Sequence, residues 1–215
     1  AVIELASATG DANNAELFIK GDRGDKAIAM IEPLWKKLPA DFSIDLMPRD
    51  QLRLLYPVVY RDELRTSSEK DDIDPRLLLA IMRQESRFRP GARSGAGARG
   101  LMQFISTTAT DVARQLDIPA FEQYDLYDPA TAVMFGSRHA ADLFKAFPSQ
   151  SEAVVAAYNA GDDNLKRWLE RAHSDQPDRY VPEIMFTQTK DYVYRVMANL
   201  RMYQLLYDET LKPID

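Results

Sequence analysis

The stretch from Asp74 to Gln103 constrains the fold of this chain more than any other. Asp74 can cap a helix with its carboxylate, and Pro75 suits the first helical position because an N–H there has no helical partner anyway. The residues that then follow with the spacing of one helix face are Leu78, Ile81, Met82 and Glu85. This face is apolar up to its last member, a carboxylic acid. Because a buried carboxylate is costly unless it is paired or neutralised, Glu85 either reaches solvent, pairs with an arginine or faces a cleft.

The loop that follows favours the cleft. Residues 93–100 read Arg-Ser-Gly-Ala-Gly-Ala-Arg-Gly, and such small residues let backbone or ligand approach closely. Leu101-Met102-Gln103 can then start a second helix beside the first. An acid at a helix end that faces a loop of this kind is a candidate catalytic group.

Composition excludes several classes of function. With 215 residues, 46% of them hydrophobic and 28% charged, the chain is expected to be a soluble globular protein. No run of 18 apolar residues predicts a membrane span, and the start at Ala1, without Met or an apolar segment, is expected to be a mature or trimmed end. Cysteine is absent, which excludes disulfides and thiolate metal sites. The only histidines are His139 and His173, so we predict neither a metal nor a cofactor.

Charge argues against nucleic acid as a partner. The net charge of −6 disfavours binding to DNA or to an anionic membrane. Five arginines nevertheless lie between Arg83 and Arg99, with Glu85 as the one acid among them. This segment is either a solvated basic face or a positive rim of the cleft.

The pattern of the whole chain predicts an all-α fold. Residues 1–70 are expected to form a short helical segment, with helices over 13–20, 25–38 (interrupted by Pro33), 48–56 and 58–68. The polar run at residues 67–72 marks the expected boundary with a second part, residues 71–215, against which the first part packs. A minor β element is expected, if anywhere, in the loop after Phe88.

Local signals place the later elements. The expected helix starts are Ser106, Asp128-Pro129 and a capping box from Ser149 to Glu152, and Gly161 is expected to stop the helix that this box begins. Trp168 is expected on a short helix, Tyr180–Phe186 as a connection that contains a proline, and Gln188–Tyr207 as a long final helix. His139 is expected to be a core or surface residue.

Four short motifs resemble those of one enzyme family. They are Glu85-Ser86, Gly100-Leu101-Met102-Gln103, Ala157-Tyr158-Asn159-Ala160-Gly161 and Asp191-Tyr192-Val193. In this order and rough spacing they resemble the soluble lytic transglycosylases, bacterial enzymes of the lysozyme superfamily that cut the glycan strands of peptidoglycan. The resemblance covers roughly Asp71 to Tyr207. Before Asp71 it extends only to the end of the α-superhelical region that precedes the catalytic domain in large members.

The resemblance implies a fold, a reaction and a location. It implies a lysozyme-like catalytic domain and a carbon–oxygen lyase that cleaves the β-1,4 bond between N-acetylmuramic acid and N-acetylglucosamine. Glu85 would act as acid and then as base, the 2-acetamido group would assist departure, and the products would carry 1,6-anhydro ends. The substrate would be peptidoglycan in the periplasm or cell envelope, and no protein partner is indicated.

The resemblance also assigns roles to other residues. Ser86 would hydrogen-bond near the scissile bond or cap the helix end, Met102 would line the sugar site, and Gln103 would donate to an N-acetyl or hydroxyl oxygen. Tyr158 would orient Glu85 or the substrate unless it is a core tyrosine. The remaining candidates for substrate binding are Asn159, Gln188, which stands where the family usually has glutamate, and Tyr192. Four aromatic residues are further candidates as sugar platforms: Tyr124, Tyr127, Tyr180 and Phe186.

Two alternatives remain open from the sequence. One is a hydrolase of the lysozyme or chitinase type on the same fold, with Asp111, Asp125 or Asp162 as a second carboxylate. The other is a non-catalytic helical module that binds glycan or protein. The transglycosylase interpretation requires Glu85 to be protonated near neutral pH, so burial must outweigh the neighbouring arginines, which are expected to point to solvent.

Overall fold

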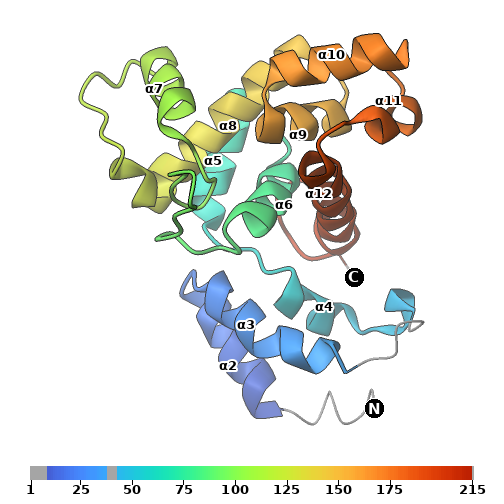
Figure 1. Cartoon of the computed structure of the whole chain (residues 1–215). Coiled ribbons are helices and arrows are strands. Elements are labelled where there is room, and N and C mark those ends of the chain that lie inside the picture. Colours follow the sequence, from blue (N-terminus) through green and yellow to red (C-terminus); the bar gives the residue numbers. More distant parts are fainter. Residues whose placement is uncertain (1–8, 38–42, 215) are drawn as a thin grey trace.

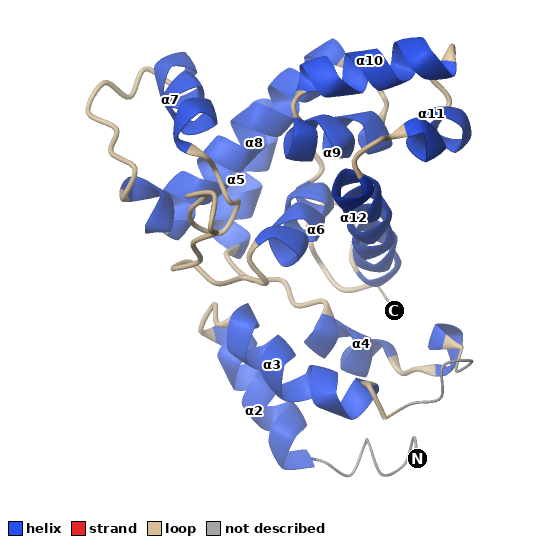
Figure 2. Ribbon diagram, in the orientation of Figure 1, coloured by secondary structure: helices blue, strands red, loops and turns tan. Residues whose placement is uncertain are grey.

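The computed structural model describes residues 9–37 and 43–214, and most of these residues are helical (Figure 2). The α-helices are α2 (Thr9–Lys20), α3 (Gly24–Trp35), α4 (Arg49–Leu55), α5 (Arg61–Asp71), α6 (Pro75–Glu85), α7 (Ser106–Gln115), α8 (Pro129–Ala146), α9 (Ser151–Ala160), α10 (Asp162–Ala172), α11 (Pro177–Glu183) and α12 (Thr187–Leu206). Two short 3₁₀ helices are η1 (Ile44–Leu46) and η2 (Asp125–Tyr127). The expected start at Ala1 and the expected helix end at residue 38 lie outside the described residues.

The all-α prediction is confirmed. The described residues contain no strand, and the loop after Phe88 carries only isolated antiparallel bridges, from Arg93 to Arg99 and from Arg99 to Phe104. The expected minor β element is therefore reduced to single bridges. None of the described helices is both long and apolar enough to cross a membrane.

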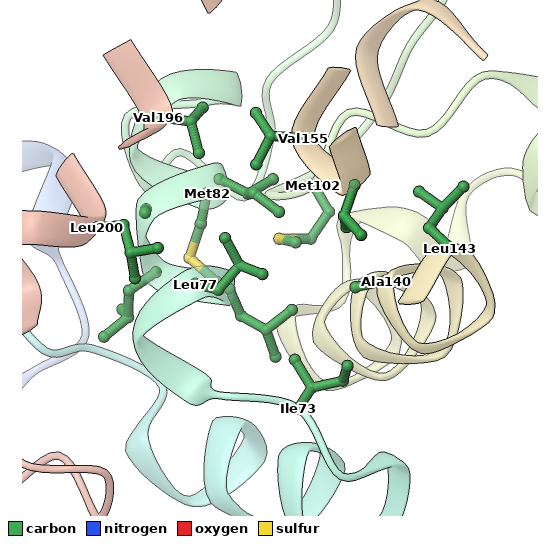
Figure 3. Packing of buried hydrophobic residues seen from close by; sticks show 14 of the residues in the cluster. Ile73, Leu77, Met82, Met102, Ala140, Leu143, Val155, Val196 and Leu200 are labelled. Carbon is green, nitrogen blue, oxygen red and sulfur yellow. The ribbon is translucent and has the colours of Figure 1, made fainter. Parts of the chain in front are cut away.

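Helix α6 lies at the centre of the core. Every residue from Leu77 to Met82 is buried, so the helix is apolar on all sides along this length. It packs along α12, and α12 also packs against α9, as Figure 1 shows. Met82, Met102 from the following loop and Val155 of α9 belong to the same buried cluster (Figure 3). The site at the end of α6 is thus built on the most buried element of the fold.

The N-terminal helices pack against the rest, as expected. Helices α2, α3 and α4 lie together below α6 and α12 in Figure 1 and share a small apolar cluster, while Ile28 and Leu52 join the main core. The hydroxyl of Tyr203 on α12 donates to the carbonyl of Pro57 at 3.1 Å. This segment therefore buries its apolar residues partly against the second part of the chain.

The polar run at residues 67–72 is not an extended linker. Ser67 and Ser68 are buried in α5, and the Ser137 hydroxyl of α8 donates to the Ser67 carbonyl at 3.0 Å. The division of the chain at residue 70 stays a prediction, and the helix that crosses it packs on α8.

The helix starts with an aspartate before a proline are confirmed, and the serine starts are wrong. Asp74 accepts from the Arg76 N–H and Asp128 from the Thr131 N–H. Ser106 is instead the first helical residue, because the extended Ile105 precedes it as the cap.

The expected capping box and the proline-containing connection are also wrong. Ser149 lies in a left-handed turn with φ 60°, two residues before α9 begins, so its hydroxyl cannot cap that helix. The segment expected as a connection from Tyr180 is partly helical, because Pro177 begins α11 and Pro182 is tolerated in its last turn.

Candidate active site

A cleft of about 770 Å³ opens where α6 ends. Its lining comes from α6, the loop between α6 and α7, and helices α7, α8, α9, α10 and α12. The predicted site residues that line it are Glu85, Met102, Gln103, Tyr158, Asn159 and Gln188. Residues from three of the four sequence motifs, together with Gln188 of α12, therefore meet in one hollow.

Glu85 is the last residue of α6, and its environment favours the protonated acid. The helix is fixed at its start by the Asp74 cap and along its length by buried apolar side chains, so its final residue is held in place. Burial raises the pKa of Glu85 from 4.5 to about 7, and a hydrogen bond from Tyr192 opposes part of that rise. No described lysine or arginine pairs with Glu85 in the structure. At neutral pH this carboxyl can therefore hold a proton and release it.

Tyr192 of α12 positions that carboxyl directly. Its hydroxyl donates to Glu85 Oε1 at 2.6 Å, across 107 residues of chain. Burial raises the pKa of Tyr192 well above its ordinary value, so the hydroxyl keeps its proton and remains a donor. The hydrogen bond fixes one carboxyl oxygen and leaves the other for a substrate.

Tyr158 has a different partner. Its hydroxyl donates to the Met102 carbonyl at 3.1 Å, so it ties α9 to the loop after α6 and makes no hydrogen bond to Glu85. Met102 is itself buried and touches the position where Gly136 of α8 lacks a side chain. Tyr158 and Met102 together form one wall of the cleft.

Gln103 lies in the cleft with its amide nitrogen already engaged. Nε2 donates to the carbonyls of Ala92 at 3.2 Å and Gly100 at 2.8 Å, and the backbone has φ 52°. The role expected for Gln103, donation to a sugar oxygen, conflicts with these contacts. Its carbonyl oxygen is the group left to face a ligand, as an acceptor.

Asn159 and Gln188 bring α9 and α12 together at the rim. Asn159 Oδ1 accepts from the hydroxyl of buried Thr189 at 2.8 Å, which leaves its amide nitrogen for a ligand. Gln188 is exposed and lines the cleft one residue earlier in α12. A neutral amide therefore stands at this position of the rim.

Comparison with known proteins identifies the family. The model of the transglycosylase SLT domain matches residues 63–181, more than half of the chain. This chain belongs to the SLT transglycosylase family. It is 34% identical over 176 residues to a Haemophilus influenzae protein provisionally named a soluble lytic murein transglycosylase, covering 81% of this chain and 30% of that protein. It is 32% identical to the soluble lytic murein transglycosylase of Escherichia coli K12, covering 76% of this chain and 26% of the relative.

Solved structures of the SLT family share the fold. The 70 kDa soluble lytic transglycosylase of Escherichia coli superposes with a TM-score of 0.74 and 27% identity, over 88% of this chain and 29% of that one. The complex of the 70 kDa soluble lytic transglycosylase with bulgecin A gives a TM-score of 0.76 at 27% identity, over 92% of this chain and 31% of that one. The chain thus spans less than a third of the length of these relatives.

Ser86 is buried and caps the end of α6. Its hydroxyl donates to the Met82 carbonyl at 3.2 Å, and its side chain is not among those that line the cleft. Of the two roles open to Ser86 from the sequence, the structure shows the helix cap.

The arginines are the clearest departure from expectation. Arg83 is largely buried and pairs with Glu32, so the expectation that these arginines point to solvent is wrong for this one. Arg87 pairs with the same glutamate, and the Arg99 guanidinium lies over the Tyr124 ring. Among the described residues that line the cleft there is no lysine or arginine, so a positive rim is wrong as well. The outcome for Glu85 is as expected, because burial outweighs any neighbouring cation.

The four candidate sugar platforms lie outside the cleft lining. Tyr180 is fully buried and Phe186 packs edge-on against Trp168. Tyr124 and Tyr127 contact each other with ring centroids 5.8 Å apart. Sequence reasoning could not separate these from a cleft residue, because any aromatic side chain near a motif satisfies the same pattern.

His139 lines the cleft, which the sequence did not predict. Its ring lies 5.1 Å from that of Tyr158 and 5.7 Å from that of Phe104, and burial lowers its pKa. Three aspartates also line the cleft, each bound to a lysine or arginine one turn away on its own helix: Asp111, Asp142 and Asp162. No motif contains His139, so only the packing of α8 against α9 reveals its place.

Replacing Tyr192 by phenylalanine is expected to shift the pH profile of cleavage. The hydrogen bond from Tyr192 stabilises the ionised form of Glu85, so its loss raises the pKa of Glu85 further and moves the high-pH limb to higher pH. We also expect the rate to fall roughly 10-fold, since the carboxyl loses its orienting contact. The measurement is the cleavage rate between pH 4 and 9. Tyr158→Phe is the matched comparison, and equal high-pH limbs in both variants would contradict the assignment.

Proposed function

We propose that this chain is the catalytic part of a lytic murein transglycosylase that cleaves peptidoglycan between N-acetylmuramic acid and N-acetylglucosamine. The observation that carries this proposal is Glu85, a mostly buried acid whose pKa lies near 7, in a cleft formed by the family motifs. The activity proposed is the one for which the relatives are named, and this chain spans less than a third of their length. In one solved relative, from Pseudomonas aeruginosa, a glutamate-to-glutamine mutant is inactive.

Glu85 has the properties of an acid that later acts as a base. As the protonated form it donates to the glycosidic oxygen as the bond to the leaving sugar breaks. As the carboxylate it then accepts the proton of the C6 hydroxyl of the muramyl sugar. That hydroxyl attacks the anomeric carbon, so the 1,6-anhydro bond closes and no water is consumed. The acetamido group of the same sugar stabilises the cationic centre in between.

The charge pattern of the cleft supports a single catalytic acid. Among the described carboxylates that line it, Glu85 is the one without a cationic partner, and burial raises its pKa to about 7. The three cleft aspartates are each held by a lysine or arginine. An attack by the sugar's own hydroxyl needs no second carboxylate, and its high effective concentration favours the intramolecular step.

The reaction would take place in the periplasm or cell envelope, where peptidoglycan lies. The other contacts of the glycan would come from Met102, Gln103, Asn159 and Gln188 along the cleft. The described lining residues of the cleft include aspartates and no lysine or arginine, which favours recognition of sugar hydroxyl and amide groups over recognition of the carboxylates of the stem peptide.

Digestion of peptidoglycan in heavy-oxygen water tests this proposal. We expect products with 1,6-anhydro muramyl ends, one water lighter than lysozyme products and without the heavy label. Mass spectrometry of the released muropeptides is the measurement. Reducing ends that carry the label would instead assign a hydrolase, with a cleft aspartate as its second carboxylate. Intact glycan with tight binding would assign a non-catalytic module.

A further inference from the structure

Helix α3 contacts the end of α6 from outside the matched SLT domain. Glu32 of α3 binds Arg87 Nη2 through Oε2 at 2.6 Å and faces Arg83 Nη2 through Oε1 at 3.8 Å. These two arginines stand two residues before and two residues after Glu85. Arg83 is further held over the Tyr56 ring, 4.6 Å from its centroid. One carboxylate thus clamps the chain on both sides of the proposed catalytic acid.

The turn that follows Glu85 is strained. Arg87 and Phe88 are consecutive non-glycine residues in the left-handed region, with φ 53° and φ 61°. A left-handed backbone is unfavourable for a residue with a side chain, so the turn persists only where its surroundings hold it. Ser86 caps α6 just before it, and its hydroxyl bond to Met82 does not restrain the residues beyond.

Helix α3 supplies two of the restraints on this turn. Glu32 holds the Arg87 side chain, as described above. Phe88 is fully buried against Gly24, at a place where a Cβ on Gly24 would come within 3.1 Å of the Phe88 ring. The first residue of α3 therefore makes room for the ring, and a residue two turns later binds the neighbouring guanidinium.

We propose that Glu32 is a positioning residue for Glu85, which holds Arg83 and Arg87 against α3 and thereby fixes the strained turn and the last turn of α6. The catalytic part of this inference, an effect of Glu32 on cleavage, rests on the proposed function. The structural part, that Glu32 restrains the turn after Glu85, rests on the contacts alone. The proposed role of Glu32 gives the helical segment over residues 1–70 a part in placing the catalytic acid, in addition to the packing described above. The SLT domain match begins at residue 63, so this residue belongs to the preceding helical segment.

Glu32 also balances charge behind the cleft. A hollow of about 370 Å³ between α3, α6 and α12 is lined by three arginines, Arg83, Arg87 and Arg195, and Glu32 is the one acid among its described lining residues. Without Glu32 these arginines keep their positive charge near the end of α6. Uncompensated cations lower the pKa of a nearby carboxyl, so Glu85 would lose its proton at lower pH.

The test compares Glu32→Gln with Glu16→Gln in the full chain. Glu16 lies exposed on α2 and has no partner among the described residues, so Glu16→Gln makes the same change of charge in the same segment. For Glu32→Gln we expect kcat to fall about 10- to 100-fold with KM nearly unchanged, because the acid is misplaced while the sugar contacts stay. The high-pH limb of kcat should also move to lower pH. Other titratable groups around Glu85 are unchanged in both variants: Tyr158, Tyr192, His139, Asp111, Asp142 and Asp162.

Two further measurements separate positioning from general loss of stability. Arg87→Gln should reproduce the fall in kcat, and the double variant with Glu32→Gln should add little to either single change. Amide hydrogen exchange over residues 84–90 should become faster in Glu32→Gln than in Glu16→Gln. Exchange does not depend on activity, so it tests the clamp even if the wild-type chain leaves peptidoglycan intact.

Each of these measurements can contradict the role proposed for Glu32. Wild-type kcat together with unchanged exchange in Glu32→Gln would overturn the proposal, as would equal losses in Glu32→Gln and Glu16→Gln. A fall in kcat that is additive with that of Arg87→Gln would also overturn it, because the two residues would then act apart. A wild-type protein without cleavage would refute the proposed function and leave the exchange result to decide the clamp.

Discussion

Replacing Glu85 by glutamine is expected to lower the rate of glycan cleavage by about 10²- to 10⁴-fold, because the cleft loses its proton donor. Glutamine keeps the shape of the side chain, and its carbonyl oxygen can still accept from Tyr192. The fold should therefore be retained. The measurement is the release of soluble muropeptides from purified peptidoglycan, with circular dichroism as the check on folding.

The same variant should be more stable than the wild type above neutral pH. Glu85 has a pKa near 7 in the folded protein and 4.5 ordinarily. Below pH 4.5 the group is protonated in both states and changes nothing. As pH rises through 4.5 to 7, the unfolded state ionises first, so the wild type loses up to about 3 kcal/mol of stability. Glutamine does not titrate, so the advantage of Glu85→Gln should be absent at pH 4 and largest at pH 8.

Glu69→Gln is the control for both effects. Glu69 is exposed on α5 and no other described residue pairs with it, so its replacement should change neither cleavage nor the difference in stability that the Glu85 variant shows between pH 4 and pH 8. Cleavage by folded Glu85→Gln at a rate near that of the wild type would remove Glu85 from the mechanism. An equal stability difference at pH 4 and pH 8 would show that the carboxyl is not buried as described.

What the sequence predicted well depends on contacts between near neighbours. Asp74 and Asp128 each cap the helix of the proline that follows, so two or three residues suffice to predict both starts. The Ser149 capping box failed because the Ser149 backbone is left-handed and α9 begins two residues later. Local patterns cannot report such a constraint.

In the candidate site, too, the residues predicted correctly depend on local sequence, and those predicted wrongly depend on contacts between distant segments. Glu85 was predicted because an acid at the end of an apolar helix face is unusual within a single element. Its partner Tyr192 lies 107 residues away, and the family resemblance had suggested Tyr158 as the residue that orients the acid. The contacts of Arg83 and Arg87 with Glu32 bridge distant segments too, which is why the sequence predicted them to be solvated.

Gly100 was predicted from the local sequence to permit a close approach, and the structure shows that it contacts a residue distant in the chain. The loop of small residues was expected to allow a close approach, and Gly100 has φ 77°. A Cβ on it would lie 1.8 Å from the carbonyl oxygen of Leu126, a fully buried residue of η2. That oxygen belongs to the backbone, so it cannot move aside without shifting η2. The glycine is thus required both by its own conformation and by its neighbour.

Gly100→Ala is therefore expected to destabilise the protein strongly. Backbone strain and overpacking together cost on the order of 4 kcal/mol, which lowers Tm by roughly 10 °C in a chain of this size. The Gly100 carbonyl also accepts from Gln103 Nε2, so movement of this backbone displaces a residue of the cleft. We expect cleavage to fall even at temperatures where the variant remains folded.

Gly97→Ala is the matched control for this prediction. Gly97 has φ 83° in the same loop, but a Cβ there would meet nothing within 4 Å. Its replacement incurs the strain alone, about 1 kcal/mol, so Tm should fall by only a few degrees. Because both variants share the loop, the residue type and the left-handed backbone, the difference between their Tm values measures the contact with Leu126. Equal Tm values would mean that η2 does not lie against Gly100, and the Gly100 carbonyl that binds Gln103 would then lack the support described for it.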